Sequence, residues 1–297
     1  MRGTVNRPTI VVTGVSGQVG FELQRTLQCL GHVVSCDRAT LDLSDLARVR
    51  EFIRKTAPSI IVNPAAYTAV DRAESDEVMA MRINAELPAT LAQEAAALGA
   101  VLVHYSTDYV FDGRKSGPYV EYDQPNPQNV YGKSKLAGEL GIAAAACAHL
   151  ILRTSWVYGR RGRNFLLTMQ RLATERRELK VVADQIGAPT WSRTIAEATA
   201  QIISQGIAAN RSEWWRERSG VYHLTAAGET SWCGFAKSIL ERDGAHSDTV
   251  VVPISTSEYP TPAARPSNSR MSIDKISKIF GLHMPAWDEA LSLCLGD

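Results

Sequence analysis

A tyrosine and a lysine four residues apart are the strongest candidates for chemistry in this sequence. Tyr131 and Lys135 enclose the run Gly-Lys-Ser, and this spacing places both side chains on one face of a helix. A phenol has an ordinary pKa of ~10, and an ammonium group nearby lowers that pKa toward neutrality. The pair therefore predicts an acid–base centre, completed by a hydroxyl from Ser106 or Thr107 at the end of a predicted strand. The alternative is a pair of ordinary surface side chains, because this spacing also arises by chance.

A glycine-rich run near the N-terminus is typical of a phosphate-binding turn. Gly14, Gly17 and Gly20 follow the β-branched segment 9–13 with the spacing G-x-x-G-x-x-G. Glycine permits a tight turn and a close approach to a pyrophosphate, and the helix that follows offers unpaired N–H groups. This position favours dinucleotide binding over a purely structural turn. The predicted cofactor contacts in the run are Gly14, Ser16, Gly17, Gln18 and Val19.

Further candidate cofactor contacts lie after the next predicted strands. Asp37 stands seventeen residues past Gly20, near the place of an acid that contacts the adenine ribose. Arg38 could accommodate a 2′-phosphate, so the pair leaves NADH and NADPH both open, and Asp37 could instead only open a turn. The remaining candidates are Asp42 and Leu43, together with Ala65 and Ala66, whose small side chains would let a cofactor lie against the backbone.

The elements that must position these residues alternate between strand and helix. Strands are predicted at 9–13, 32–36, 60–62, 100–106 and 149–153. Helices are predicted at 18–30, 44–56, 77–98 and 131–147, and Pro88 should kink or restart the third of them. This alternation implies right-handed βαβ crossovers, so the expected fold class is α/β with a Rossmann-type doubly wound parallel sheet.

The second half of the chain is less regular and indicates a smaller unit. A helix is predicted at 191–203, whereas much of 159–185 and 228–266 lacks a clear alternation. The segment 259–266, YPTPAARP, predicts an ordered extended loop or a linker. We therefore expect a dinucleotide-binding domain formed by residues 1–160 and roughly 191–225. Residues 161–190 and 226–297 would form a smaller, irregular α/β domain beside the sheet.

Composition excludes several classes of protein. The 297 residues are 45% hydrophobic and 21% charged, which is ordinary for a soluble globular chain and unlike a disordered or fibrous one. A net charge of +1 provides no field that would recruit nucleic acid or an anionic membrane. The five scattered cysteines suggest neither a disulfide framework nor a zinc site. Neither a signal peptide nor a membrane span is recognisable, so a soluble, cytoplasmic protein is expected.

Longer blocks of the sequence resemble one family. The blocks are 14–23 (GVSGQVGFEL), 62–74 (VNPAAYTAVDRAE), 104–111 (HYSTDYVF), 129–138 (NVYGKSKLAG), 153–158 (RTSWVY), 184–190 (DQIGAPT) and 259–270 (YPTPAARPSNSR). Over nearly its whole length the chain resembles the dTDP-4-dehydrorhamnose reductase family of the extended short-chain dehydrogenases/reductases. Several of these blocks are specific to that family rather than general to dehydrogenases. The resemblance implies a cofactor domain in the first half and a C-terminal domain that binds a sugar nucleotide.

The resemblance also implies a reaction and roles for individual residues. The expected reaction is hydride transfer from NADPH or NADH to the C4 ketone of dTDP-4-dehydro-L-rhamnose, with Tyr131 as proton donor and no catalytic metal. Thr107 would stabilise the developing alkoxide, and Lys135 would lower the pKa of Tyr131 and fix the cofactor. The substrate contacts implied by the match are Thr107, Asp108, Tyr131, Trp156, Arg265 and Asn268, with Ser269 in the same loop.

One position departs from the family pattern. Some members form a dimer around a magnesium ion held by glutamates, and Glu22 keeps the first of these positions. Arg193 stands at the next, and a cation cannot ligate a cation; Asp288 or Glu289 could supply a C-terminal ligand. Magnesium is therefore doubtful, and we expect a monomer or a weak homodimer with a small sugar-nucleotide substrate as its partner.

Two other functions are compatible with such a fold. A regulatory subunit would bind NAD(P) without catalysis, but it would not need Thr107, Tyr131, Lys135 and Trp156 together. A sugar-nucleotide epimerase or dehydratase of the same superfamily is the other alternative. Asp108 supplies an acid next to the hydroxyl, but the glutamate that a dehydratase needs does not follow it.

Overall fold

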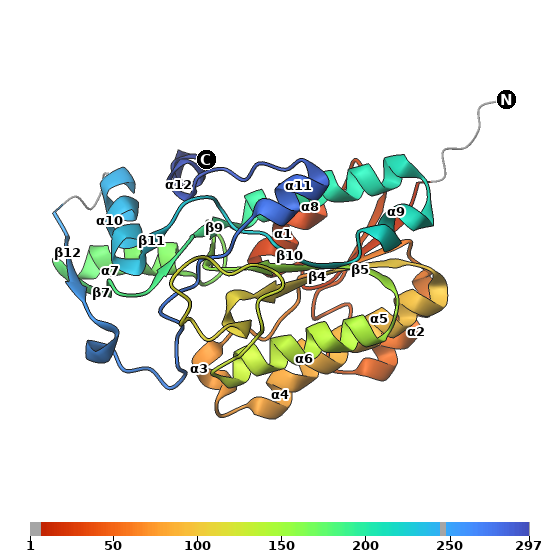
Figure 1. The fold of residues 1–297 in the computed structure, drawn as a ribbon, viewed down its shortest axis with the longest axis horizontal. Helices are drawn as coiled ribbons and strands as arrows, with labels where there is room; N and C mark the ends of the chain where they lie inside the picture. The colour runs from red at the N-terminus through yellow and green to blue at the C-terminus, as the bar shows by residue number, and fades with distance from the viewer. Residues whose placement is uncertain (1–6, 244–247, 297) are drawn as a thin grey trace.

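Six parallel strands form the central sheet of the protein, whose computed structural model describes residues 7–243 and 248–296 (Figure 1). The strands are β1 (Thr9–Val12), β2 (His32–Ser35), β3 (Ile60–Asn63), β4 (Val101–Thr107), β5 (Ala148–Thr154) and β10 (Gly220–His223). Their order across the sheet is β10-β5-β4-β3-β1-β2, and every neighbouring pair is parallel. The predicted α/β fold class with a Rossmann-type doubly wound sheet is therefore confirmed. β10 was not predicted; it pairs with β5 at one edge.

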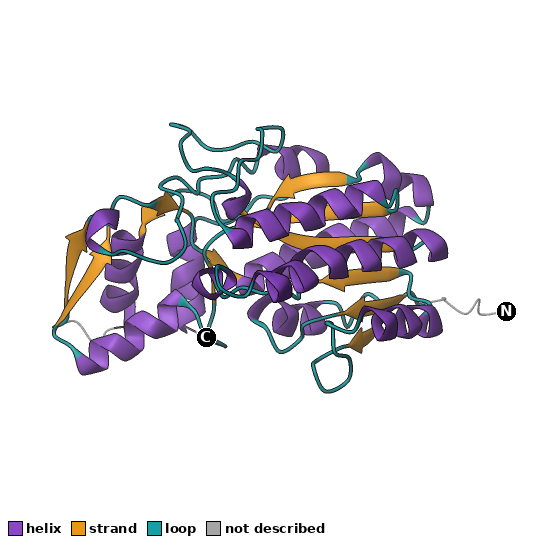
Figure 2. Cartoon of the chain, turned by 90° about the horizontal axis from the view of Figure 1, so that it is seen from below, coloured by secondary structure: helices purple, strands orange, loops and turns teal. Residues whose placement is uncertain are grey.

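Helices cover both faces of this sheet because alternate strand residues point in opposite directions. In β1, Ile10 and Val12 pack into one core cluster, whereas Val11 packs into the cluster on the other face. The first cluster includes residues of α1 (Gln18–Thr26), α8 (Ser192–Ala209), α9 (Ser212–Glu217) and α11 (Asp274–Phe280). The second includes residues of α2 (Leu46–Thr56), α5 (Leu87–Leu98) and α6 (Val130–Ala144). Figure 2 shows the strands lying side by side between these helices.

The predicted helix 77–98 is interrupted by a π-helical turn, and a new α-helix starts at the residue before Pro88, in agreement with the predicted restart. α4 (Glu77–Met81) leads into the π turn η1 (Arg82–Glu86), and α5 follows without a break. Pro88 lies in the first turn of α5, where its fixed φ suits the start of a helix. The short helix α3 (Val70–Ala73) precedes this stretch. No helix of the described residues is both long and apolar enough to cross a bilayer.

A third core cluster lies beside the sheet, at the left of Figure 2. It contains residues of α7 (Phe165–Glu175), β7 (Glu178–Val182), α10 (Trp232–Asp243), β12 (Val250–Ile254) and α12 (Trp287–Gly296). β7 and β12 pair in parallel although about seventy residues separate them. Four short strands complete the unit: the parallel pair β6 (Val157–Tyr158) and β9 (Thr190–Trp191), and β8 (Ile186–Gly187) with its antiparallel partner β11 (Thr230–Ser231). The ranges that lack a clear sequence alternation thus contain regular elements.

The proline-rich segment 259–266 forms an extended loop after the 3₁₀ turn η3 (Thr256–Glu258). It continues to α11 without a regular element and passes back toward the sheet, where Met271 makes a β-bridge with Tyr119. α11 then packs into the core cluster of the sheet through Ile276 and Phe280. The C-terminal part of the chain therefore contributes to both cores.

Candidate active site

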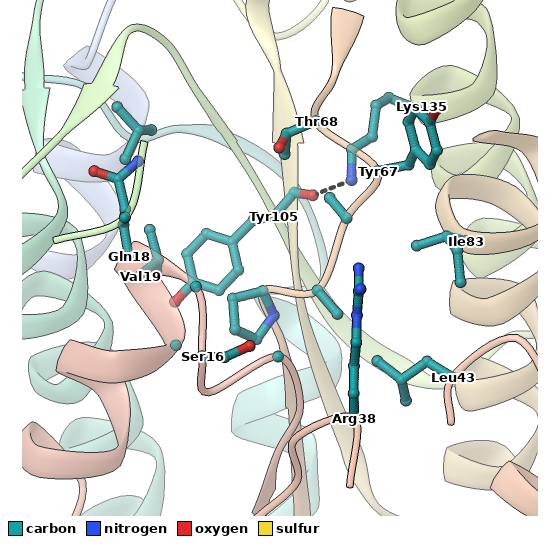
Figure 3. Close-up of a pocket in the computed structure, with 18 of the residues that line it drawn as sticks. Ser16, Gln18, Val19, Arg38, Leu43, Tyr67, Thr68, Ile83, Tyr105 and Lys135 are labelled. Atoms are coloured by element: carbon teal, nitrogen blue, oxygen red, sulfur yellow. Dashed lines mark hydrogen bonds between the residues drawn. The ribbon is translucent and has the colours of Figure 1, made fainter. Parts of the chain in front are cut away.

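A pocket of about 860 Å³ lies at the C-terminal ends of β1, β3 and β4 (Figure 3). β1 pairs with β2 on one side and β3 on the other, so the direction of strand succession reverses here, which is where ligands bind in open α/β sheets. All the predicted cofactor residues line this one pocket: Gly14, Ser16, Gly17, Gln18, Val19, Asp37, Arg38, Asp42, Leu43, Ala65, Ala66, Tyr131 and Lys135.

The glycine-rich turn forms one wall of the pocket. Gly14 has a φ of +57°, and a Cβ there would lie 2.9 Å from the Cα of Ala65, so conformation and space both require glycine. Helix α1 begins after Gly17 without a side-chain cap. The N–H groups of its first turn and the positive end of its dipole are therefore available to an anion in the pocket.

Asp37 and Arg38 follow β2 and both line the pocket, but only Asp37 is bonded within its own turn. Asp37 Oδ1 accepts hydrogen bonds from the backbone N–H groups of Ala39 (3.0 Å) and Thr40 (2.9 Å) and from the Thr40 hydroxyl. These bonds hold the pKa of Asp37 below its ordinary value and fix the carboxylate in its own turn. The Arg38 side chain extends into the pocket beside Leu43 (Figure 3).

Tyr131 lies in the first turn of α6, and its surroundings keep its proton in place. Asn129 caps the helix by accepting the backbone N–H of Gly132 at 2.7 Å. Burial raises the pKa of Tyr131 above its ordinary value; the Thr107 hydroxyl opposes this and the charge of Asp108 adds to it. The sequence predicted the opposite direction, a lowering by Lys135. That prediction is wrong for this structure, because desolvation outweighs the other influences.

Lys135 lies one turn further along α6 and is fully buried. Its Nζ donates to the backbone oxygen of Tyr105 at 2.6 Å and lies 3.2 Å from Nε2 of His104 (Figure 3 shows the first contact). Burial lowers the pKa of Lys135 to about 8, and the charge of Glu139 opposes that shift. The amine is thus held at the floor of the pocket by β4.

Thr107 and Asp108 stand at the C-terminal end of β4, next to the pocket rather than in its lining. The Thr107 hydroxyl donates to Asp108 Oδ1 at 2.9 Å and accepts the N–H of Tyr109. Burial raises the pKa of Asp108 to about 6, which the hydroxyls of Ser269 and Thr107 oppose. Asp108 Oδ2 is buried and accepts no hydrogen bond of ordinary geometry from the described residues.

Trp156 follows β5 with an unusual backbone conformation and is the centre of an aromatic group. Its φ is +47°, a left-handed value that a tryptophan seldom adopts. Its ring stacks on Trp232 with centroids 3.6 Å apart and an angle of 12°. A Cβ on Gly187 would lie 2.7 Å from Cε2 of the Trp156 ring, so the backbone of β8 also packs closely against the indole.

The loop after residue 259 brings Arg265 to the same region. Arg265 pairs with Asp71 at 2.8 Å and donates to the Tyr109 hydroxyl at 3.2 Å. The Tyr109 ring in turn meets Tyr131 edge to face, with centroids 5.4 Å apart. The C-terminal loop therefore contacts the surroundings of Tyr131 through a short chain of side chains.

Asn268, by contrast, is fully engaged within the protein. Its amide nitrogen donates to the carbonyls of Lys115 and Gly117, and its oxygen accepts the N–H and Nε–H of Arg270. An amide has about this many positions for hydrogen bonds. The structure thus gives Asn268 the role of bracing two loops, and the predicted substrate contact is not supported.

Sequence reasoning missed several residues that line or support the site. Tyr67 and Thr68 line the pocket, as does the predicted candidate Ser106, and Asn84 in the π turn joins Tyr67 to Ser134 of α6 through its side-chain amide. Asp71, Tyr109 and His104 lie in sequence blocks that had been recognised, but nothing in their spacing indicated a contact. Trp232 gave no signal at all, because only the tertiary fold brings it to Trp156.

No group of three or more His, Cys, Asp or Glu side chains that could hold a metal occurs in residues 7–243 and 248–296. Arg193, at the position where the family pattern has a glutamate, forms an ion pair with Glu197 at 3.1 Å. Both residues and Glu22 line a second, smaller pocket.

The sheet is parallel, an uncapped glycine turn lies at its switch point, and α6 brings a Tyr–Lys pair to the same pocket. These features define a Rossmann-type protein of the short-chain dehydrogenase/reductase kind. The family model "RmlD substrate binding domain" matches residues 8–297. A dTDP-4-dehydrorhamnose reductase of Burkholderia thailandensis is 48% identical, covering 97% of this chain and 98% of that protein. One of Escherichia coli K12 is 42% identical with 97% of both chains covered. The chain belongs to the dTDP-4-dehydrorhamnose reductase family.

Solved structures show the same likeness. The dTDP-4-dehydrorhamnose reductase of Bacillus anthracis, solved in complex with NADP, has a TM-score of 0.89 and 36% sequence identity, covering 97% of this chain and 98% of that one. More distant structures, such as a UDP-glucose 4-epimerase of Thermus thermophilus at 18% identity and a TM-score of 0.78, share the fold.

Proposed function

We propose that this protein reduces the C4 ketone of dTDP-4-dehydro-L-rhamnose to dTDP-L-rhamnose with NADPH or NADH. The observation that carries the proposal is the meeting of Tyr131 and Lys135 with the uncapped glycine turn in one pocket. The names of the relatives at 42–48% identity support the substrate, and the NADP-bound relative supports the cofactor.

The pocket fits a dinucleotide. Gly14 lies close to Ala65 in its wall and leaves no room for a larger side chain there. The first turn of α1 offers N–H groups to a pyrophosphate. Ala65 and Ala66 would contact the cofactor, and Lys135 would bind the nicotinamide ribose. When bound, the reduced nicotinamide supplies the hydride.

The chain's own residues would manage the proton and the developing charge. Tyr131 keeps its proton at neutral pH because burial raises the pKa of its phenol, so it can donate that proton to the carbonyl oxygen. Thr107, whose hydroxyl acts on the same phenol, would hydrogen-bond the oxygen as negative charge develops. Once the phenol has given its proton, Lys135 one turn away would stabilise the phenolate.

The smaller core beside the sheet would hold the sugar nucleotide. We propose that residues 161–190 and 226–297 mainly form this substrate domain, although α11 packs on the sheet. Trp156 would pack against the sugar, Asp108 Oδ2 would accept a hydrogen bond from substrate, and Arg265 would pair with a phosphate. Arg265 would have to exchange its contact with Asp71 for that role.

We infer that NADPH is the better cofactor. The Asp37 carboxylate is already bonded within its own turn, whereas Arg38 extends into the pocket next to it. A guanidinium can bind a 2′-phosphate with two charge-assisted hydrogen bonds, and NADH lacks that phosphate.

The test follows cofactor oxidation with dTDP-4-dehydro-L-rhamnose generated in situ. Because Tyr131→Phe removes the only atom proposed to donate the proton, we expect a loss of kcat of at least about 100-fold, with NADPH still bound. The matched control is Tyr122→Phe, which removes a hydroxyl from an exposed side chain outside the pocket and should keep full activity. An active Tyr131→Phe enzyme would refute the assigned proton donor.

The alternative functions are not favoured. A regulatory subunit would bind NADPH but oxidise none with this substrate, and an epimerase or dehydratase would convert a sugar nucleotide without net consumption of NADPH. The same assay separates both from a reductase. We propose a monomer or weak homodimer that works without magnesium, so EDTA should leave the rate unchanged.

A further inference from the structure

Four buried polar side chains form a continuous line beneath the pocket. Thr13 follows β1, Asn63 ends β3, His104 lies in β4 and Lys135 lies in α6. The Thr13 hydroxyl lies 2.6 Å from one atom of the Asn63 side-chain amide, the other amide atom lies 3.0 Å from His104 Nδ1, and His104 Nε2 lies 3.2 Å from Lys135 Nζ. All four side chains are at most 1% exposed. The line connects the residue before the glycine turn to the amine proposed to bind the ribose.

His104 is the link that meets Lys135. Burial, and then the charge of Lys135, lowers the pKa of His104 well below its ordinary value, so the imidazole is neutral. A neutral imidazole has one donor and one acceptor nitrogen. Nε2 accepts from the Lys135 ammonium, so Nδ1 carries the proton and donates to the Asn63 side chain, whose oxygen must face the ring while its nitrogen faces the Thr13 hydroxyl. Because both nitrogens are engaged and the ring is enclosed, Nε2 is a fixed point on the floor of the pocket.

We propose that His104 is a positioning residue for Lys135. Its Nε2 and the Tyr105 carbonyl hold the amine in place, while Asn63 and Thr13 hold the imidazole. Lys135 has four rotatable side-chain bonds, so an amine fixed before the cofactor arrives spares most of the entropy of ordering it. The inference rests on the proposed function for the cofactor role of Lys135.

Two isosteric variants test the contact with the amine. A glutamine amide reaches about as far as Nε2 of histidine, whereas an asparagine amide reaches only as far as Nδ1. His104→Gln therefore keeps a polar group next to Lys135, and His104→Asn keeps only the one next to Asn63. Measured by NADPH fluorescence without substrate, the Kd should rise about tenfold in His104→Asn and remain within about threefold of wild type in His104→Gln.

A double-mutant cycle separates positioning from a merely structural role. In the Lys135→Met background, His104→Asn should weaken NADPH binding no further, because the group that it positions is gone. An equal loss in both backgrounds, or an unchanged Kd in His104→Asn, would overturn the proposal. If Lys135→Met alone leaves the Kd unchanged, the cofactor role of Lys135 fails and the positioning role fails with it. The wild-type protein would still reduce the substrate in that case, so failure of the positioning role can be told apart from failure of the proposed reductase function.

Thr13→Val provides a second variant if His104→Asn does not fold. It keeps the shape of the far end of the line but removes its hydroxyl. It should raise the Kd of NADPH by a smaller factor than His104→Asn does, and only when Lys135 is present. A Kd that rises equally without Lys135 would show that the line only stabilises the fold.

Discussion

Arg38 shows how one side chain can select a cofactor at a site that the backbone otherwise builds. Arg38→Ala removes the guanidinium that extends into the pocket. Two charge-assisted hydrogen bonds to a 2′-phosphate are worth about 1.5–3 kcal/mol each, so kcat/KM for NADPH should fall at least about tenfold. The value for NADH should change less than about threefold, because NADH carries no group for Arg38 to bind.

Steady-state kinetics with each cofactor measure this difference. Arg177→Ala, an exposed arginine outside the pocket, is the matched control for a lost positive charge. An equal fall for NADH and NADPH would contradict the assignment, since it would indicate a general effect on the pocket.

Tyr131 and Lys135 also show the limit of reasoning from residue types. Their spacing correctly predicts one helix and one pocket, but it led to the wrong direction for the pKa of Tyr131. The spacing indicates that the charge of Lys135 lies one helical turn from Tyr131. It does not state that the phenol is enclosed, or that Lys135 Nζ bonds the Tyr105 carbonyl.

At the scale of elements, α6 must approach its neighbours closely to place Tyr131 and Lys135. A Cβ on Gly138 would lie 2.1 Å from the backbone oxygen of Asn84 in the π turn. Gly138→Ala should therefore push α6 outward, which we expect to destabilise the protein by about 1–3 kcal/mol despite the better helix propensity of alanine. It should also lower kcat/KM, because the catalytic side chains move with the helix.

Urea denaturation and the reduction assay measure both effects. Gly117→Ala is the matched control, since its Cβ would enter open space. If the two variants have the same stability, the close contact between α6 and the π turn is not what holds the helix.

At the scale of the whole molecule, the C-terminal part of the chain completes the core of the sheet. Phe280 ends α11, is 4% exposed and packs with Tyr222 and Trp214. Phe280→Ala should cost about 3–5 kcal/mol of the free energy of unfolding, because it removes a large buried side chain from the main core. Unfolding should remain a single transition, since the tail and the sheet share that core.

The control is Leu293→Ala, because Leu293 is 65% exposed. Its free energy of unfolding should lie within about 0.5 kcal/mol of wild type. A separate early transition in Phe280→Ala would show instead that α11 unfolds independently of the sheet.

The sequence by itself determined five of the six strands of the sheet, the glycine turn and the predicted cofactor contacts that line the pocket. These follow from local signals: β-branched strands, helix periodicity, and glycines where the chain must turn tightly, as at Gly14. Because parallel strands present their C-terminal ends at one edge, residues chosen for lying after those strands meet in space.

Only the tertiary structure decided the rest. It joined Trp156 to Trp232, fixed Asn268 between two loops, and placed His104 beneath Lys135. β7 and β12 pair across about seventy residues, and α11 returns to a core that it shares with β1, β3 and β4 from the first half. Such contacts depend on burial and on distances between segments far apart in the chain. No local pattern of residue types encodes them.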